Sequence, residues 1–237
     1  MAHYVLVHGG QHGAWCWERL IPLLDAAGHR VTAPDLAGMG QDRTPFAPDA
    51  LAQWADQIAA LIEREAEPVI LVGHSRGGLV ISEVAERVPD RIRRLVYLAA
   101  FLLPPGASMM QSLVDYMPGG PPPIIIDEES GTVMLKPGVA EPMFYNLCSP
   151  EDAAACVARL SPEPIQTMSQ GLRISMERFG QVPRAYIETT HDRAIALEHQ
   201  RAMQADLPCE KILRIDSDHS PFYSAPLQLR DALLALA

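Results

Sequence analysis

The sequence predicts an α/β protein built on a doubly wound, mostly parallel sheet of about six strands. Short apolar runs alternate with longer segments of helical periodicity, which is typical of repeated strand–helix–strand units. The short runs contain few polar residues, so they indicate strands that are buried on both faces of the sheet. We expect these strands at His3–His8, Arg30–Pro34, Val69–Gly73, Leu95–Ala99, Arg184–Glu188 and Lys211–Ile215.

The segments between these strands predict the helices that cover the sheet. They are Trp15–Ala26, Ala50–Glu65, Gly78–Val88, Ala194–Asp206 and Pro226–Leu236.

Residues 104–179 interrupt the alternation. The segment opens with Pro104, continues through the proline-rich stretch Gly119–Pro123, and contains a good helix start at Ser149 and Pro150. We therefore expect a core formed by residues 1–103 and 180–237. The residues between them would form an inserted cap, part irregular and part helical, over the carboxyl edge of the sheet.

Composition limits the classes of function. The 237 residues are 48% hydrophobic and 20% charged, as in an ordinary globular protein. The net charge of -10 argues against binding to nucleic acid or to an acidic membrane surface. No apolar run approaches the roughly 18 residues of a membrane span, and no secretory signal is visible. The four cysteines lack Cys-x-x-Cys spacing, so we expect reduced thiols in a cytoplasmic protein.

The stretch Gly73–Gly78, read Gly-His-Ser-Arg-Gly-Gly, is the most informative motif. It follows an expected strand and precedes an expected helix, which is the setting of a Gly-x-Ser-x-Gly nucleophile elbow. Such a turn exposes its serine hydroxyl at the sheet edge. Ser75 is therefore the predicted nucleophile, and a purely structural turn is the alternative.

A serine nucleophile needs a base and an acid, which should follow it in the order Ser, Asp, His. His219 lies just past the last expected strand, whereas His199 falls inside a helix. Asp192 follows the preceding strand and is the predicted acid.

Asp216 and Asp218 are rival candidates for the acid. Both are close to His219 along the chain, which makes pairing across a site difficult, and turn formation explains them as well.

Two backbone N–H groups should hold the oxyanion, those of Gly10 in the loop after the first strand and of Arg76 after the nucleophile. The Arg76 side chain either forms a surface salt bridge or meets a substrate carboxylate. His8 and His12 flank the first loop without a cluster of carboxylates or thiols, so we expect structural hydrogen bonds there and no metal. No organic cofactor is implied.

The expected cap is rich in methionine and aromatic residues, which fill its own core or line a pocket. The sequence predicts neutral, hydrophobic small-molecule substrates. The candidate substrate-binding residues are Phe101, Met110, Phe144 and Phe222.

Seven stretches of the core carry a resemblance to known proteins: Val5–Trp15, Leu23–His29, Val31–Leu36, Val69–Gly78, Tyr97–Phe101, Tyr186–Thr190 and Asp218–His219. They resemble the plant methylesterase and hydroxynitrile lyase group of the α/β-hydrolase superfamily, and the run from His219 to Ser224 is similar to bacterial carboxylesterases, including pyrethroid hydrolases. The resemblance covers most of the core and little of the cap. It implies an α/β-hydrolase fold, the catalytic and oxyanion residues named above, and a possible homodimer.

Two positions separate the chemistries of this group. Its cyanohydrin-cleaving members carry a threonine after the first-loop histidine and a lysine after the catalytic histidine, where this chain has Gly9 and Ser220. We therefore expect a serine carboxylesterase. The alternatives are a hydroxynitrile lyase or other non-hydrolytic relative, an oxygenase or perhydrolase, and a small-molecule receptor with slow hydrolysis.

Overall fold

Six parallel strands form the central sheet of the computed structural model, which describes residues 1–116 and 123–237. The spatial order is β2-β1-β3-β4-β8-β9, so the chain starts near one side and winds outward in both directions. The predicted fold class and the six strand positions are confirmed. The strands are β1 (His3–Val7), β2 (Arg30–Thr32), β3 (Val69–His74), β4 (Ile92–Leu98), β8 (Arg184–Thr189) and β9 (Lys211–Ile215).

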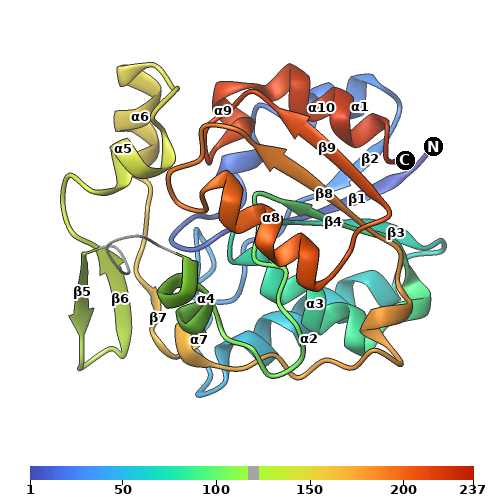
Figure 1. Ribbon diagram of the computed structural model, residues 1–237, viewed down its shortest axis with the longest axis horizontal. Helices are drawn as coiled ribbons and strands as arrows, with labels where there is room; N and C mark the ends of the chain where they lie inside the picture. The colour runs from blue at the N-terminus through green and yellow to red at the C-terminus, as the bar shows by residue number, and fades with distance from the viewer. Residues whose placement is uncertain (117–122) are drawn as a thin grey trace.

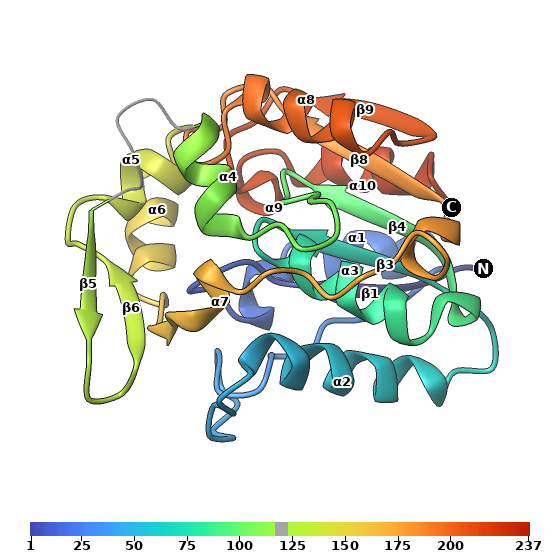
Figure 2. The same ribbon diagram turned by 60° about the horizontal axis from the view of Figure 1, so that its bottom comes forward.

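Helices cover both faces of this sheet (Figures 1 and 2). One face packs against α2 (Ala50–Glu63), α3 (Gly77–Arg87) and α8 (Leu197–Asp206). The other packs against α1 (Ile21–Ala26), α9 (Pro221–Ser224) and α10 (Pro226–Leu234). The fully buried Trp54 and Trp17 anchor the two resulting cores.

Two predicted helices begin later than expected. The segment Trp15–Ala26 divides into a 3-10 turn, η1 (Ala14–Trp17), and α1, because Pro22 lacks an N–H and sits in the first turn of a new helix. Helix α8 begins at Leu197 because the N–H groups of Ala194 and Ile195 donate to the Asp192 carboxylate instead. Two further 3-10 turns, η2 (Pro89–Arg91) and η3 (Phe179–Gln181), flank the sheet.

Of the chain between β4 and β8, the described part from Gly106 to Leu172 lies over the carboxyl ends of the strands, and we call it the cap (Figure 1). Residues 173–183 run back along the sheet to the start of β8. The two ends of the cap meet, since Gly106 N–H donates to Leu172 O and Leu172 N–H donates to Ala107 O. The limits 104 and 179 stay predictions. The cap helices are α4 (Met109–Tyr116), α5 (Ala140–Phe144), α6 (Pro150–Val157) and α7 (Gln166–Ser169).

Ser149 caps α6 by accepting a hydrogen bond from Asp152 N–H at 3.1 Å, as the sequence predicts. The cap also contains an antiparallel sheet, which differs from the irregular and helical cap that the sequence predicts. Its strands are β5 (Ile124–Asp127), β6 (Thr132–Leu135) and β7 (Glu163–Pro164). Met117 and the stretch 119–122 lie outside the described residues.

Within residues 1–116 and 123–237, no helix is long and apolar enough to cross a membrane. The four cysteines carry free thiols, of which Cys16 and Cys156 are buried.

Replacing Gly78 by alanine should lower the free energy of unfolding by about 2–3 kcal/mol, measured by urea denaturation. An added Cβ would lie 2.2 Å from the carbonyl oxygen of Phe101, and backbone cannot easily move there. This clash outweighs the gain of about 1 kcal/mol that alanine normally gives in a helix. Gly180→Ala is the control, because the three atoms nearest to its Cβ would all belong to the side chain of the exposed Met176. Equal stability of both variants would contradict the prediction.

Candidate active site

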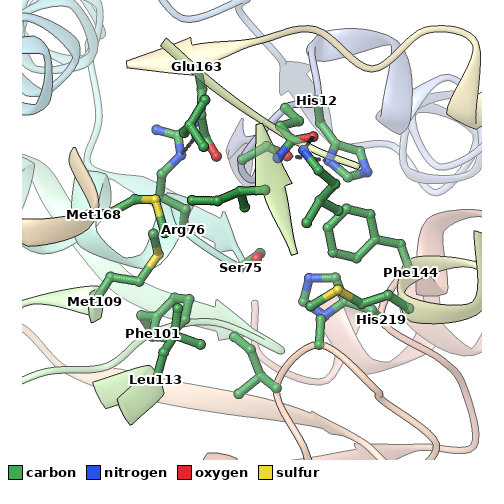
Figure 3. Close-up of a pocket in the computed structure, with 18 residues that line it drawn as sticks. His12, Ser75, Arg76, Phe101, Met109, Leu113, Phe144, Glu163, Met168 and His219 are labelled. Atoms are coloured by element: carbon green, nitrogen blue, oxygen red, sulfur yellow. Dashed lines mark hydrogen bonds and ion pairs between the residues drawn. The ribbon is translucent and has the colours of Figure 1, made fainter. Parts of the chain in front are cut away.

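Ser75 occupies a tight turn between β3 and α3. Its φ of 52° lies in the left-handed region, which costs a residue with a side chain about 1–2 kcal/mol. Three backbone hydrogen bonds hold this turn: Ser75 N–H donates to Leu98 O, while Gly78 N–H and Phe101 N–H both donate to Ser75 O. The sheet and the helix therefore impose a conformation that presents the Ser75 side chain to the pocket above it (Figure 3).

His219 and Asp192 form a buried pair in loops at the carboxyl ends of β9 and β8. Nδ1 of His219 lies 2.8 Å from Oδ2 of Asp192, and both side chains are almost completely inaccessible to solvent. The Asp192 carboxylate also accepts the Thr189 hydroxyl at 3.0 Å and two backbone N–H groups at 2.8 Å. These donors hold the carboxylate as an acceptor, so Nδ1 of His219 carries the proton and Nε2 is left as a base.

The two rival acids are engaged elsewhere. Asp216 is exposed and bonds His191. Asp218 is buried, and its carboxylate accepts the N–H groups of Leu147 and Ser220 at 2.8 and 2.9 Å. It therefore fastens the cap to the loop after β9 and does not bond the imidazole.

The proposed oxyanion donors, the N–H groups of Gly10 and Arg76, have no backbone acceptor among the described residues. Both residues line the pocket that Ser75 also lines. Arg76 is the N-cap of α3, so its N–H lies at the positive end of that helix dipole. A negative oxygen at this place would meet donors that need no reorganisation.

The pocket has a volume of about 80 Å³ and lies between the sheet edge and the cap. Ser75 and His219 both line it, without a direct hydrogen bond between them in the part of the chain that the structure describes. Such contacts often tighten only when substrate is bound. Most of the wall is apolar, and it is formed by Phe101, Met109, Leu113, Ile124, Val133, Leu135, Met143, Phe144, Met168, Ala194 and Ile195.

Two of the predicted substrate-binding residues, Phe101 and Phe144, line this pocket, and two do not. Met109 takes the place expected for Met110, because adjacent residues of α4 point about 100° apart. Phe222 is fully buried behind the site, where its ring packs edge-on against His74 and Trp17.

An ion pair beside the nucleophile was missed from the sequence. Nε of Arg76 lies 2.6 Å from Oε2 of Glu163, a residue of the cap strand β7, and both side chains are buried. The guanidinium also stacks 4.1 Å from the centre of the Trp54 ring. Burial lowers the pKa of Arg76 and raises that of Glu163, while the attraction between the partners opposes both changes. Arg76 is therefore neither a surface residue nor a free cation.

Three further histidines in and under the site are held neutral, and one of them, His12, lines the pocket. Burial lowers the pKa of His8 to about 3 and of His12 to about 4, and it lowers the pKa of His74 well below its usual value. Each makes structural hydrogen bonds: His8 with Gly9 O, His12 with Gly10 O and Tyr145, and His74 with His219 O.

Within residues 1–116 and 123–237, no three His, Cys, Asp or Glu side chains are grouped as metal ligands would be. The arrangement brings together a serine hydroxyl, an imidazole bonded to a carboxylate, and two N–H groups without a backbone acceptor.

The model of the alpha/beta hydrolase family matches residues 4–232, and the chain belongs to this family. It is 34% identical to Methylesterase 1 of Arabidopsis thaliana, in a match that covers 99% of this chain and 95% of that protein. It is 35% identical to an alpha-hydroxynitrile lyase of the same plant, over 99% of this chain and 96% of that protein.

The crystal structure of polyneuridine aldehyde esterase superposes with a TM-score of 0.86 at 28% identity, over 100% of this chain and 99% of that one. The resemblance to the methylesterase and hydroxynitrile lyase group is thus confirmed. The expected enzyme class, a carboxylic ester hydrolase, agrees with the names of the esterase relatives.

Asp192→Asn should lower kcat for an ester substrate by about 10³-fold or more, because an amide would favour the wrong tautomer of His219. Asp218→Asn is the matched control, a buried acid that contacts the neighbouring loop and not the imidazole. It should lose stability but keep kcat within about tenfold of wild type. If Asp218→Asn lost more kcat than Asp192→Asn, Asp218 and not Asp192 would be the acid that assists His219.

Stability should fall as the pH drops from 7.5 to 5.5. His8, His12 and His74 stay neutral in the folded state but take up protons near pH 6.5 when unfolded, so the unfolded state binds more protons in this window. Each histidine should cost about 1.4 kcal/mol of unfolding free energy between these two pH values. Urea denaturation at several pH values should show that the unfolding free energy of His12→Gln falls by about 1.4 kcal/mol less than that of wild type over this range. An equal fall in both proteins would show that His12 titrates alike in the folded and unfolded states.

Proposed function

We propose that this protein is a serine carboxylesterase that hydrolyses small to medium, neutral and hydrophobic esters through an acyl-enzyme. One observation carries the proposal: Ser75, held in the left-handed turn, shares a pocket with the imidazole of His219, whose Nδ1 is already bonded to Asp192. The esterase names of relatives that match over nearly the whole chain support the same conclusion.

In the proposed acylation step, Nε2 of His219 accepts the proton of the Ser75 hydroxyl while the oxygen attacks the ester carbonyl. The carbonyl electron pair moves to its oxygen, which the N–H groups of Gly10 and Arg76 stabilise. The imidazolium, stabilised by Asp192, then gives its proton to the leaving alkoxide as the C–O bond breaks. Water repeats these steps on the acyl-enzyme and releases the acid.

The pocket favours uncharged substrates of limited size. Its walls are mainly apolar, and its cation, Arg76, is already neutralised by Glu163, so a substrate carboxylate would have to break a buried ion pair. The volume of about 80 Å³ is below the roughly 300 Å³ of common ligand pockets. A short acyl or alkyl group fits this space, and a longer one requires cap side chains to move.

Lyase chemistry is disfavoured although a relative of 35% identity carries that name. A side chain at Gly9 would begin 2.8 Å from His74 Nδ1 and 2.9 Å from Ser75 Cβ, so the threonine of cyanohydrin-cleaving members does not fit here. Ser220, where those members carry a lysine, is fully buried and offers no charge to a departing cyanide. Mandelonitrile cleavage by the wild-type protein would overturn this preference.

A cytoplasmic location is also proposed, on the support of the four free thiols in a chain whose buried Cys16 and Cys156 form no disulfide.

Ser75→Ala should reduce the steady-state hydrolysis of p-nitrophenyl acetate by about 10³-fold or more. Ser82→Ala is the matched control, since Ser82 lies in α3 and its hydroxyl bonds Gly78 O and Tyr97, away from the pocket. The control should keep its turnover. Full activity of the Ser75 variant would refute the mechanism, and a single equivalent of product from wild type would identify a receptor with slow hydrolysis.

Met109→Ala should raise kcat/KM for p-nitrophenyl octanoate relative to acetate by about tenfold, because it removes a pocket wall and makes room for about two more methylene groups. Met110→Ala, one residue further along the same helix, should leave the ratio of the two esters unchanged because Met110 does not line the pocket. The two variants thus separate an effect of pocket size from an effect of cap stability. If both gave the same ratio of octanoate to acetate kcat/KM, the acyl group would bind away from Met109.

A further inference from the structure

Two side chains form hydrogen bonds with the peptide group that joins Gly9 to Gly10. Its carbonyl oxygen, Gly9 O, accepts hydrogen bonds from His8 Nδ1 at 2.9 Å and from Arg76 Nη2 at 3.2 Å. Leu36 N–H donates to Nε2 of His8, so the proton of that ring sits on Nδ1 and points at Gly9 O. Because a peptide group is planar, fixing its oxygen also fixes the direction of its N–H, which is the proposed oxyanion donor of Gly10.

The cap determines where the Arg76 guanidinium lies. Glu163 of β7 pairs with Nε of Arg76 at 2.6 Å, and both side chains are buried. The guanidinium also stacks on Trp54, whose own ring N–H donates to Ala37 O at 2.8 Å. Figure 3 shows Arg76 and Glu163 linked at the rim of the pocket, across from His219.

Glu163 also lies directly against the first loop. A Cβ placed on Gly10 would be 2.5 Å from Oε1 of Glu163, so the carboxylate occupies the space beside the donor peptide. An unpaired negative charge at this distance would oppose an oxyanion, and Arg76 neutralises it. The two side chains therefore act as one unit.

We propose that Arg76 and Glu163 are positioning residues of the oxyanion site, an inference that rests on the proposed esterase function. The Arg76 side chain orients and polarises the Gly9–Gly10 peptide through its carbonyl oxygen, while its own main-chain N–H supplies the second donor. Glu163 holds the guanidinium in place and makes this arrangement depend on a docked cap.

The test compares Arg76→Met, the double variant Arg76→Met with Glu163→Gln, and a control, Glu83→Gln. Glu83 is another buried acid paired with an arginine, and it lies in α3 away from the pocket. Arg76→Met leaves a buried carboxylate without its partner and lowers stability. The double variant removes both charges and keeps the shape of the pair.

The double variant should lose about tenfold or more in kcat, less than the full loss of an oxyanion donor, while KM changes by less than about threefold. Its affinity for 1,1,1-trifluoro-2-butanone should fall by the same factor as kcat. Ser75 adds to the carbonyl carbon of this ketone, His219 takes the serine proton, and the new oxyanion occupies the donor site. Arg76→Met alone should be less active than the double variant, because only it leaves the Glu163 charge unpaired.

The proposal is overturned if the double variant keeps wild-type kcat and ketone affinity, or if Glu83→Gln loses as much of both. The amide proton resonance of Gly10 gives a readout that does not need catalysis. It should shift in the double variant and stay in place in the control. A wild-type protein without ester turnover or ketone adduct would refute the esterase function. An unshifted Gly10 resonance in the double variant would refute the positioning role in either case.

Discussion

The rest of the site depends on the left-handed turn at Ser75. A residue with a side chain occupies that conformation only when its surroundings compensate the cost, and here β4, the chain directly after β4, and α3 all form hydrogen bonds with the turn. The helix that follows packs so closely that a Cβ on Gly77 would touch Val7 O at 2.8 Å. This contact brings the loop after β1 against the start of α3, and Gly10 and Arg76 thus line the same pocket as Ser75.

Polar contacts at the same place also dock the cap. Gln11 O accepts Ser161 N–H at 2.9 Å and its side chain accepts Leu135 N–H at 3.3 Å. Tyr145 bonds His12, and Asp218 holds the N–H of Leu147 next to His219. The loops that carry the candidate site residues therefore also hold the cap, through a few hydrogen bonds.

The sheet and the candidate triad were predictable because both depend on local pattern and chain order. Strands buried on both faces read as apolar runs, and Asp192 and His219 follow two of them directly. The hairpin from Ile124 to Leu135 had a signal, two apolar runs around a turn that ends at Gly131 with φ of 65°, which the prolines nearby obscured. The sequence could not show which of Met109 and Met110 faces the pocket, since the rotation of a short helix about its axis depends on the surfaces that it packs against. Glu163 gave no signal because a two-residue strand has no periodicity.

A buried ion pair seldom adds much stability, since removing two charges from water costs about as much as their attraction returns. The pair does, however, oppose displacement of the cap. Strand β7 is two residues long and pairs with β6 at only Thr132 and Val133, so few backbone contacts fix its register. Glu163 is one of these two residues, and its buried carboxylate lies 2.6 Å from Nε of the buried Arg76. A register that separated the two side chains would bury two unpaired charges, which is strongly unfavourable. The proposed positioning of the Gly9–Gly10 peptide therefore depends on the same ion pair that resists a shift of β7.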